Sequence, residues 1–227
     1  SAADIVVTTG ASNIGNAASA VVLGDASNKG TLSYTGIIDS YIRGLTVNAG
    51  GGEIDVTTGG QTLTIQTAGI TNGGAFTIGG AGNTTISSVI SSSGSLTKVD
   101  AGTLTLSGTN TYSGATTISN GTLNANATAA IGDGSATNTL IFTGGTLQAA
   151  GTITSPSTRT VTLTSTGIID TNGNSVSIAG IMSGAGGLTK TGAGTLTLSG
   201  TNTYTGVTTI TAGTLSVATI GDGGVAG

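Results

Sequence analysis

Short runs in which threonine alternates with leucine, isoleucine or valine recur along the chain, with glycine between them. In Thr103–Leu106 the sequence TLTL puts Leu104 and Leu106 on one face of an extended segment and the two threonines on the other. Gln61–Ile65 and Gly144–Gln148 show the same alternation. The pattern predicts strands of about three to five residues that recur roughly every eight to eleven residues.

Asparagine–glycine pairs interrupt these runs at Asn72-Gly73, Asn120-Gly121 and Asn172-Gly173. Both residue types adopt positive φ at low cost, and the pair is typical of tight turns. We therefore expect the chain to turn a corner at each of these three places.

Two stretches of the chain are nearly identical. Residues Ser95–Leu123 and Gly187–Leu215 lie 92 residues apart and are identical at 22 of 29 aligned positions. The sequence IGDG follows each copy, at Ile131–Gly134 and Ile220–Gly223. A unit of alternating threonine and leucine cannot bury its own apolar face, so it becomes stable by stacking on copies of itself. The repeat favours a coil over a β-sandwich, which would have strands of similar length.

In such a coil, the 92-residue period would contain four or five turns of roughly 18–25 residues. One turn adds ~4.8 Å along the axis, so the chain would form about ten turns and a rod roughly 50 Å long. No shift in composition divides the sequence. We predict one all-β domain over residues 1–227, a single continuous β-solenoid.

Composition excludes several other classes of protein. Charged residues make up 6% of the chain, against about 25% in a typical domain. The mean hydropathy of +0.32 and the net charge of −4 argue against disorder and against nucleic-acid binding. Glycine lacks the three-residue period of collagen. No apolar run approaches the ~18 residues of a membrane helix. Since cysteine is absent, the chain has no disulfide.

The motif LTKxxAGTLTLSGTNTYxGxTTIxxGTL, at Leu96–Leu123 and Leu188–Leu215, resembles the autotransporter-associated β-strand repeat of bacterial type V secretion passengers. Residues Arg159–Gly187 resemble the usual lead-in to that repeat. The resemblance implies a right-handed parallel β-helix at the cell surface, with a repeat that assists secretion and folding. The chain departs from full-length members because it contains no segments typical of the translocator barrel, which we expect to be absent from it.

Lys98 and Lys190 hold equivalent positions in the two copies, although the chain has only five basic residues. If the two lysines had a function beyond structure, they would contact a ligand or supply the amine of an isopeptide bond. We expect instead that both are solvated side chains at corners of the coil, since isolated charges are rarely buried. Asp100 follows Lys98 by two residues, but the second copy has Gly192 there, so the motif needs no ion pair.

A β-helix enzyme acting on carbohydrates would need two or three acidic groups, sometimes with arginine or lysine, that converge on one face. The candidates are Asp39, Glu53, Asp55 and Asp170, with Arg43 and Arg159. Glu53 and Asp55 are two residues apart on one face of a predicted strand. Because the acids are few and histidine is absent, we expect them to be exposed solubilising groups, and we predict no enzymatic activity and no catalytic residue.

Three further patterns have possible binding functions. Asp133 and Asp222 in IGDG could suggest calcium, but one aspartate in a turn offers too few ligands, so we expect both to cap turns and expect no metal or cofactor. Tyr112 and Tyr204 could pack on sugars, yet we favour a packing role. Outward threonine pairs could form an ice-binding or glycan-binding ladder, but we interpret them as widely separated pairs of ordinary strand residues. These pairs are Thr62/Thr64, Thr103/Thr105, Thr160/Thr162/Thr164 and Thr195/Thr197.

The sequence therefore predicts a structural, surface-exposed or extracellular passenger segment that acts as a stalk, fibre or adhesin scaffold. We expect partners to be copies of itself stacked end to end, or further passenger turns. A host or neighbouring cell surface is a further candidate partner. We expect no nucleic acid and no direct insertion of this segment into a membrane. A carbohydrate-active enzyme and a threonine-ladder binding module stay as alternatives.

Overall fold

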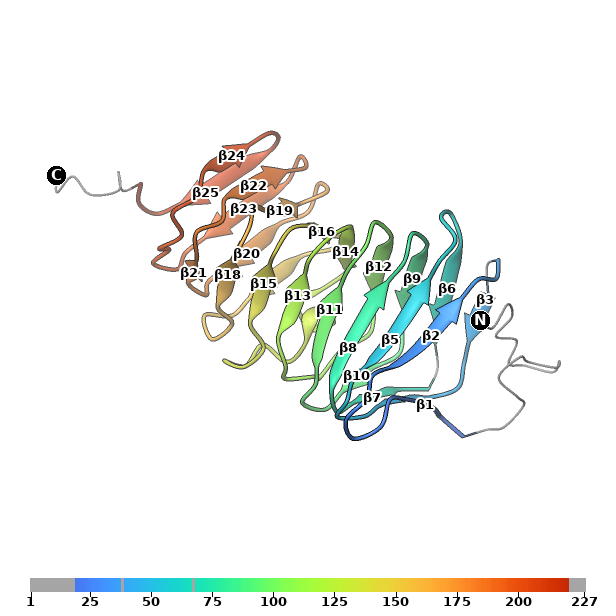
Figure 1. Cartoon of the computed structure of the whole chain (residues 1–227). Coiled ribbons are helices and arrows are strands. Elements are labelled where there is room, and N and C mark those ends of the chain that lie inside the picture. Colours follow the sequence, from blue (N-terminus) through green and yellow to red (C-terminus); the bar gives the residue numbers. More distant parts are fainter. Residues whose placement is uncertain (1–18, 38, 67, 221–227) are drawn as a thin grey trace.

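The computed structural model describes residues 19–37, 39–66 and 68–220. The described chain is all-β and winds into a parallel β-solenoid of about nine turns. Figure 1 shows the turns stacked along one axis, from the N-terminal to the C-terminal part of the chain. The predicted fold class is confirmed, and the number of turns is close to the expected ten. The boundaries predicted at residues 1 and 227 lie outside the described residues.

Each turn crosses three faces. The eight-stranded face contains β2 (Gly30–Tyr34), β5 (Gly52–Val56), β8 (Ala75–Gly79), β11 (Ser95–Lys98), β13 (Thr116–Ile118), β15 (Leu140–Phe142), β18 (Val161–Leu163) and β21 (Met182–Ser183). The nine-stranded face contains β3 (Asp39–Tyr41), β6 (Thr62–Ile65), β9 (Asn83–Ile86), β12 (Thr103–Leu106), β14 (Thr122–Ala125), β16 (Thr146–Ala149), β19 (Gly167–Asp170), β22 (Leu188–Thr191) and β24 (Thr208–Ile210).

The third face, here called the divided face, consists of two four-stranded sheets. The first contains β1 (Val21–Leu23), β4 (Leu45–Val47), β7 (Ile70–Asn72) and β10 (Ile90–Ser91). The second contains β17 (Ile153–Ser155), β20 (Val176–Ile178), β23 (Thr195–Leu198) and β25 (Thr214–Val217). Between them lie residues 109–111, which have no assigned strand, and the 3₁₀ helix η1 (Thr128–Ile131). The Thr111 N–H still donates to the carbonyl of Ile90, so the stacking continues across the division.

All strand pairs are parallel and join one turn to the next. Leu96 pairs with Thr116 in the following turn, and Thr116 pairs in turn with Leu140. These spacings lie within the predicted range of turn lengths. The alternation is also confirmed, because Leu104 and Leu106 are buried while Thr103 and Thr105 lie on the outer face. The stacked leucine, isoleucine and valine side chains form one core cluster along the solenoid.

The two copies of the repeat do not occupy the same faces. The first copy begins at Leu96 on the eight-stranded face, and four turns later that face is reached again at Met182. The second copy begins a few positions beyond, at Leu188, which lies on the nine-stranded face. The period of the repeat is therefore four turns plus one face. Sequence copies that are nearly identical point to different sides of the solenoid.

The second copy ends at the last described turn, and its outer edge is more exposed. Ile210 is 53% exposed and Val217 is 38% exposed. The equivalent residues of the first copy, Ile118 and Ala125, are both 0% exposed because β15 and β16 stack on them. The same sequence is thus buried where a further turn covers it, and open where none of the described residues does.

The chain turns a corner at all three asparagine–glycine pairs, as predicted, and positive φ occurs at two of them. Gly121 has a φ of 63°, and Asn172 and Gly173 have φ values of 46° and 80°. At Asn72-Gly73 the chain turns from β7 to β8 without positive φ at either residue, and Asn72 is the buried last residue of β7. Here the asparagine side chain points inward and donates from Nδ2 to the carbonyl of Ser95 in the next turn, so it serves packing between turns.

Close stacking predicts a large difference between two glycines. A Cβ at Gly102 would lie 1.8 Å from the carbonyl oxygen of Gly82, whereas a Cβ at Gly59 would meet only Ala81, at 3.8 Å. We expect Gly102→Ala to lower the free energy of unfolding by about 2 kcal/mol or more, because two turns must separate. Gly59→Ala should be neutral or stabilising by roughly 0.5 kcal/mol. Urea denaturation followed by circular dichroism measures both, and equal effects would contradict the close approach.

Candidate functional site

The lysine of each repeat is buried, which corrects the prediction that both are solvated. Lys98 is 2% exposed and Lys190 is 0% exposed. The Lys98 ammonium donates to the carbonyls of Val99 and Asp100, the second at 2.8 Å. The Lys190 ammonium donates to the carbonyls of Thr191 and Gly192, both at 2.8 Å. The lysines fold inward because the chain turns immediately after them and directs carbonyl oxygens at the ammonium.

Burial lowers the pKa of Lys98 to about 8, and the nearby Asp100 opposes this shift. The pKa of Lys190 is lowered in the same direction by burial and opposed by Asp170. At pH 7 the Lys98 side chain is therefore still charged. Neither lysine has a carboxylate within ion-pair distance in the part of the chain that the structure describes. Backbone carbonyls make direct contacts with both ammonium groups, and the carboxylates act on them from a greater distance.

The asparagine of the repeat joins three successive turns. Asn110 accepts the Ile90 N–H at 2.8 Å and donates to the carbonyl of Ala130 at 2.6 Å. In the second copy, Asn202 accepts the Met182 N–H at 2.9 Å. Both asparagines lie where no strand is assigned, and the amide supplies the hydrogen bonds that a regular strand would make. The sequence pattern did not indicate that these asparagine side chains connect neighbouring turns.

The tyrosine of the repeat has the packing role that the sequence predicts. Tyr112 is fully buried, and its hydroxyl lies 2.8 Å from the hydroxyl of Thr116. Tyr204 makes the equivalent contact with Thr208 at 2.7 Å, and it is only partly buried because it lies in the last described turn. Burial raises the pKa of Tyr112. A ring enclosed in the core cannot stack on a sugar.

Arg159, a candidate for an enzymatic site, is buried within the solenoid. Its Nε and Nη2 donate to the side-chain oxygen of Asn138 at 3.0 and 2.5 Å, and Nη2 also donates to the carbonyls of Ile131 and Gly132. Burial lowers the pKa of Arg159, although the side chain stays charged. The guanidinium thus closes the corner that follows η1 and faces no acidic candidate.

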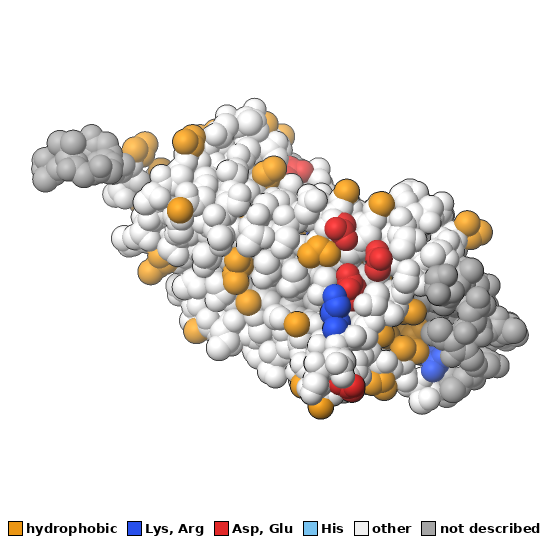
Figure 2. Space-filling view, in the orientation of Figure 1, with side chains coloured by type: hydrophobic (Ala, Val, Ile, Leu, Met, Phe, Trp, Pro, Cys, Tyr) orange, Lys and Arg blue, Asp and Glu red, His pale blue; other side chains and the backbone are white. Residues whose placement is uncertain are grey.

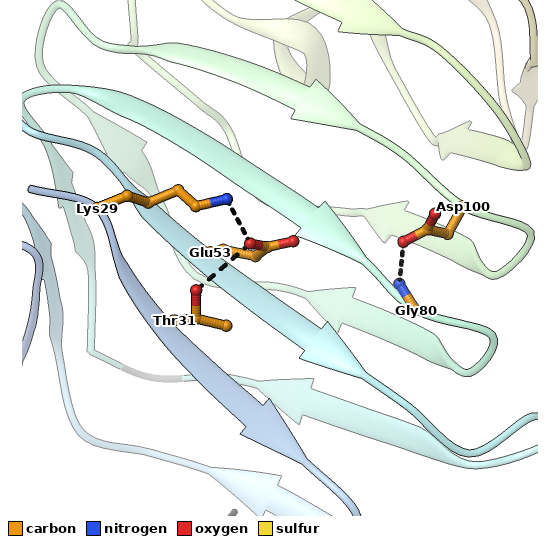
Figure 3. Close-up of polar contacts among 5 residues, drawn as sticks. All are labelled: Lys29, Thr31, Glu53, Gly80 and Asp100. Atoms are coloured by element: carbon orange, nitrogen blue, oxygen red, sulfur yellow. Dashed lines mark hydrogen bonds and ion pairs between the residues drawn. The ribbon is translucent and has the colours of Figure 1, made fainter.

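Three carboxylates gather on the eight-stranded face and at its edge, and we call Glu53, Asp55 and Asp100 the acidic patch. Figure 2 shows acidic side chains close together on this side of the molecule, next to a basic one. Glu53 accepts from Lys29 Nζ at 2.6 Å and from the Thr31 hydroxyl at 3.4 Å. Asp100 accepts the Gly80 N–H at 3.0 Å, as Figure 3 shows.

The acidic patch surrounds two glycines. A Cβ at Gly79 would lie 2.8 Å from an oxygen of Asp100 and 3.5 Å from one of Glu53. A Cβ at Gly80 would lie 2.7 Å from an oxygen of Asp55. Burial, followed by the charges of Glu53 and Asp100, raises the pKa of Asp55. The prediction that Glu53 and Asp55 share an outer face is confirmed, but both side chains are partly buried rather than fully exposed.

The patch borders an open depression of about 430 Å³, lined by Asp55, Thr57, Gly80, Ala81, Asp100, Ala101 and Asn120. No basic side chain is among these lining residues. Among the described residues, no group of three or more histidine, cysteine, aspartate or glutamate side chains is placed to hold a metal ion. The depression therefore offers two carboxylates, those of Asp55 and Asp100.

The remaining acidic and basic candidates lie apart from the patch. Asp170 accepts from Gln148 Nε2 at 2.8 Å and from the Asn172 N–H at 2.9 Å. Arg43 donates to the carbonyl of Ser19. Asp39 begins β3, and its side chain lies outside the described part. Of the five candidates whose side chains the structure describes, it brings together only Glu53 and Asp55, and it adds Asp100 to them.

Outward threonines do form columns on successive turns, which corrects the view that they are widely separated. On the nine-stranded face Thr64, Thr85 and Thr105 are in register, as are Thr103, Thr122 and Thr146. The first column continues through Asn124, Gln148 and Asp170, whose side chains hydrogen-bond to one another at 2.7 and 2.8 Å. The polar side chains in this part of the face are therefore hydrogen-bonded within the protein. Binding of ice or glycans by the threonines stays a prediction.

Asp133 caps its own turn as expected: its carboxylate accepts the Ser135 N–H at 2.9 Å. The equivalent Asp222 lies outside the described residues. Over the ranges described, the structure has no helix long and apolar enough to span a bilayer.

The polar residues of the motif are thus corner and inter-turn contacts repeated in both copies. A family model described as passenger-associated-transport-repeat matches residues 96–125 and 188–217. This match and the parallel β-solenoid support an autotransporter-associated β-strand repeat protein. The matched residues cover the two sequence copies and include the buried lysines, asparagines and tyrosines. No curated protein and no solved structure matched the chain.

The matched repeat is one of secreted or cell-surface autotransporter passengers. The fold and the repeat together support a passenger scaffold and suggest a structural role. Sequence reasoning missed the inward lysines, although one signal was present. Lysine is kept in both copies of a chain with five basic residues, and both copies have a glycine at the corner of the following turn, Gly121 and Gly213.

The pKa values of Asp55 and Asp25 are shifted in opposite directions, so substitution of each by asparagine should have opposite effects on stability. Since the pKa of Asp55 is raised in the folded chain, its ionisation destabilises the fold at pH 7, and this loss disappears as the pH falls below the unfolded pKa of 3.8. Asp55→Asn should therefore raise the free energy of unfolding at pH 7 by roughly 0.5 kcal/mol, and with it the melting temperature. The substitution should have no effect at pH 3.

Asp25→Asn is the matched control. Hydrogen bonds from Asn28 and Ser27 lower the pKa of Asp25, so its charged form favours folding above pH 3.8 and that contribution is lost as the pH falls. The substitution should lower the melting temperature at pH 7. Thermal melts at both pH values test this contrast, and destabilisation by Asp55→Asn at pH 7 would contradict it.

Proposed function

We propose that the chain is a rigid stalk in a surface-anchored passenger, which holds an adhesive or otherwise functional part away from the bacterial surface. The observation that carries this proposal is the parallel pairing that continues without a break along the eight-stranded and nine-stranded faces, around one apolar core. Every described strand pairs only with strands of the neighbouring turns. A rod of this kind transmits force along its axis through many parallel hydrogen bonds.

The same arrangement supports a role in secretion. Each turn finds its pairing partner in the turn just completed, as Thr116 pairs with Leu96, so folding can propagate from an existing edge. The repeat adds short-range contacts: in the first copy Asn110 bonds to the preceding turn, and Lys98 bonds to its own corner. A chain that emerges through a pore can therefore add turns as they appear, without waiting for distant residues.

An in-register deletion tests the stalk. Removal of residues 96–187 joins Ser95 to Leu188 and restores the repeat motif, so we expect a folded chain that is shorter by about four turns, or roughly 20 Å. Small-angle X-ray scattering measures the maximum dimension, and circular dichroism measures the fold.

A deletion of residues 96–177 is the control, because it joins Ser95 to Ile178 and breaks the motif. It should unfold or aggregate. If both deletions fold equally well, or if the in-register variant does not shorten, the turn-by-turn rod is contradicted.

We further propose that the edge formed by β24 and β25 pairs with more solenoid, either further passenger turns or a second copy. The support is the contrast between Ile210 and the buried Ile118, together with the unpaired edges of both strands among the described residues. Open parallel edges bind additional strands.

Ile210→Lys should weaken self-association of the chain in sedimentation velocity, because it places a charge on this edge. Val89→Lys changes an exposed residue in the middle of the solenoid, 42% exposed, and should leave association unchanged. A wild-type chain that stays monomeric at high concentration would contradict pairing with a second copy.

A further inference from the structure

The Lys190 ammonium lies within a cage of oxygen atoms from three successive turns. Thr171, in the preceding turn, contributes its hydroxyl at 2.9 Å. The carbonyls of Thr191 and Gly192 belong to the same turn as the lysine, and the carbonyl of Ala212 comes from the following turn at 3.1 Å. The three N–H donors of an ammonium group match such a cage, which has four acceptors and no carboxylate within ion-pair distance in the described chain.

Two backbone features create the space for this cage. The residue two positions after the lysine is in the left-handed region in both copies, with φ 58° at Asp100 and 79° at Gly192. Gly213 lies in the following turn with φ 69°, and a Cβ there would lie 2.8 Å from the lysine nitrogen. A Cβ at Gly213 would lie still closer, at 2.3 Å, to the carbonyl oxygen of Gly192, so the glycine keeps room for the backbone as well as for the ammonium. Gly121, with φ 63°, holds the equivalent position in the first copy.

The cage is built for a cation rather than for an apolar side chain. Buried carbonyl oxygens without a donor are strongly unfavourable, and rings of carbonyls replace the hydration of monovalent cations in other proteins. In this chain the cation is supplied by the side chain of the repeat itself. It joins three turns where a chain without cysteine has no disulfide to do so.

We propose that each repeat corner is a binding site for a primary ammonium group, filled in the native chain by Lys190 or Lys98. The Lys98 corner has fewer acceptors, since its ammonium contacts two carbonyls. The register places Gly80, which has no hydroxyl, where Thr171 lies in the second copy. The proposal concerns the corner and does not depend on the stalk function.

Chemical rescue tests the site. Lys190→Ala removes a propylammonium group, so we expect a clear loss in melting temperature and recovery of at least half of that loss when the variant refolds in n-propylammonium chloride. Tetramethylammonium chloride at the same concentration has no N–H donor and should give no recovery. Lys98→Ala should show a smaller loss and a smaller rescue, because fewer oxygens are left without a donor.

Lys190→Met keeps a long apolar side chain in the space and should fold even where Lys190→Ala is too unstable. It should melt below the wild type and gain nothing from n-propylammonium. Lys29→Ala controls for general salt effects, since this ammonium is exposed and pairs with Glu53. A Lys190→Met variant as stable as the wild type, or a Lys190→Ala variant that no primary ammonium restores beyond the Lys29→Ala control, would overturn the proposal.

Discussion

Parallel backbone pairing between successive turns is the constraint on which the rest of the structure depends. Because each strand pairs in register with a strand one turn away, every side chain lies directly above an equivalent one in the next turn. Inward positions must then be apolar in turn after turn, and corners must be narrow enough for backbones to touch. The glycines, the alternating threonines and leucines, and the scarcity of charge all follow from this requirement.

The few charges that remain inside are placed where the backbone turns. Lys98, Lys190 and Arg159 are three of the five basic residues of the chain, and all three point into corners where carbonyls converge. A corner exposes carbonyls that have left the regular ladder, and a buried polar group without a partner is unfavourable. Cationic side chains and the amide of Asn110 satisfy these groups. Polar residues of the repeat thus act between turns, as its apolar residues do.

The sequence predicted those features that depend on neighbouring residues in the chain. Alternation of Leu104 and Leu106 with threonine determined the strands and their inner face, and the repeat indicated stacking. It did not predict the inward Lys98, because the carbonyls around its ammonium become visible only when the path of the corner is known. The columns that include Thr64, Thr85 and Thr105 depend on turn length, which varies from one turn to the next. The acidic patch was half predicted: Glu53 and Asp55 are neighbours in a strand, whereas Asp100 joins them from two turns away.

The offset of one face between the two copies has a consequence for how such a chain can evolve. Duplication of a segment with this period lengthens the rod and also rotates each new copy to another side. A binding surface that evolved on the outside of one copy would therefore not line up with its duplicate, and a flat partner lying along one side would meet only one of the two. Interior features suffer no such misalignment, since a corner is surrounded by its own neighbours on any side. Lengthening by duplication preserves what is inside the rod and scatters what is outside.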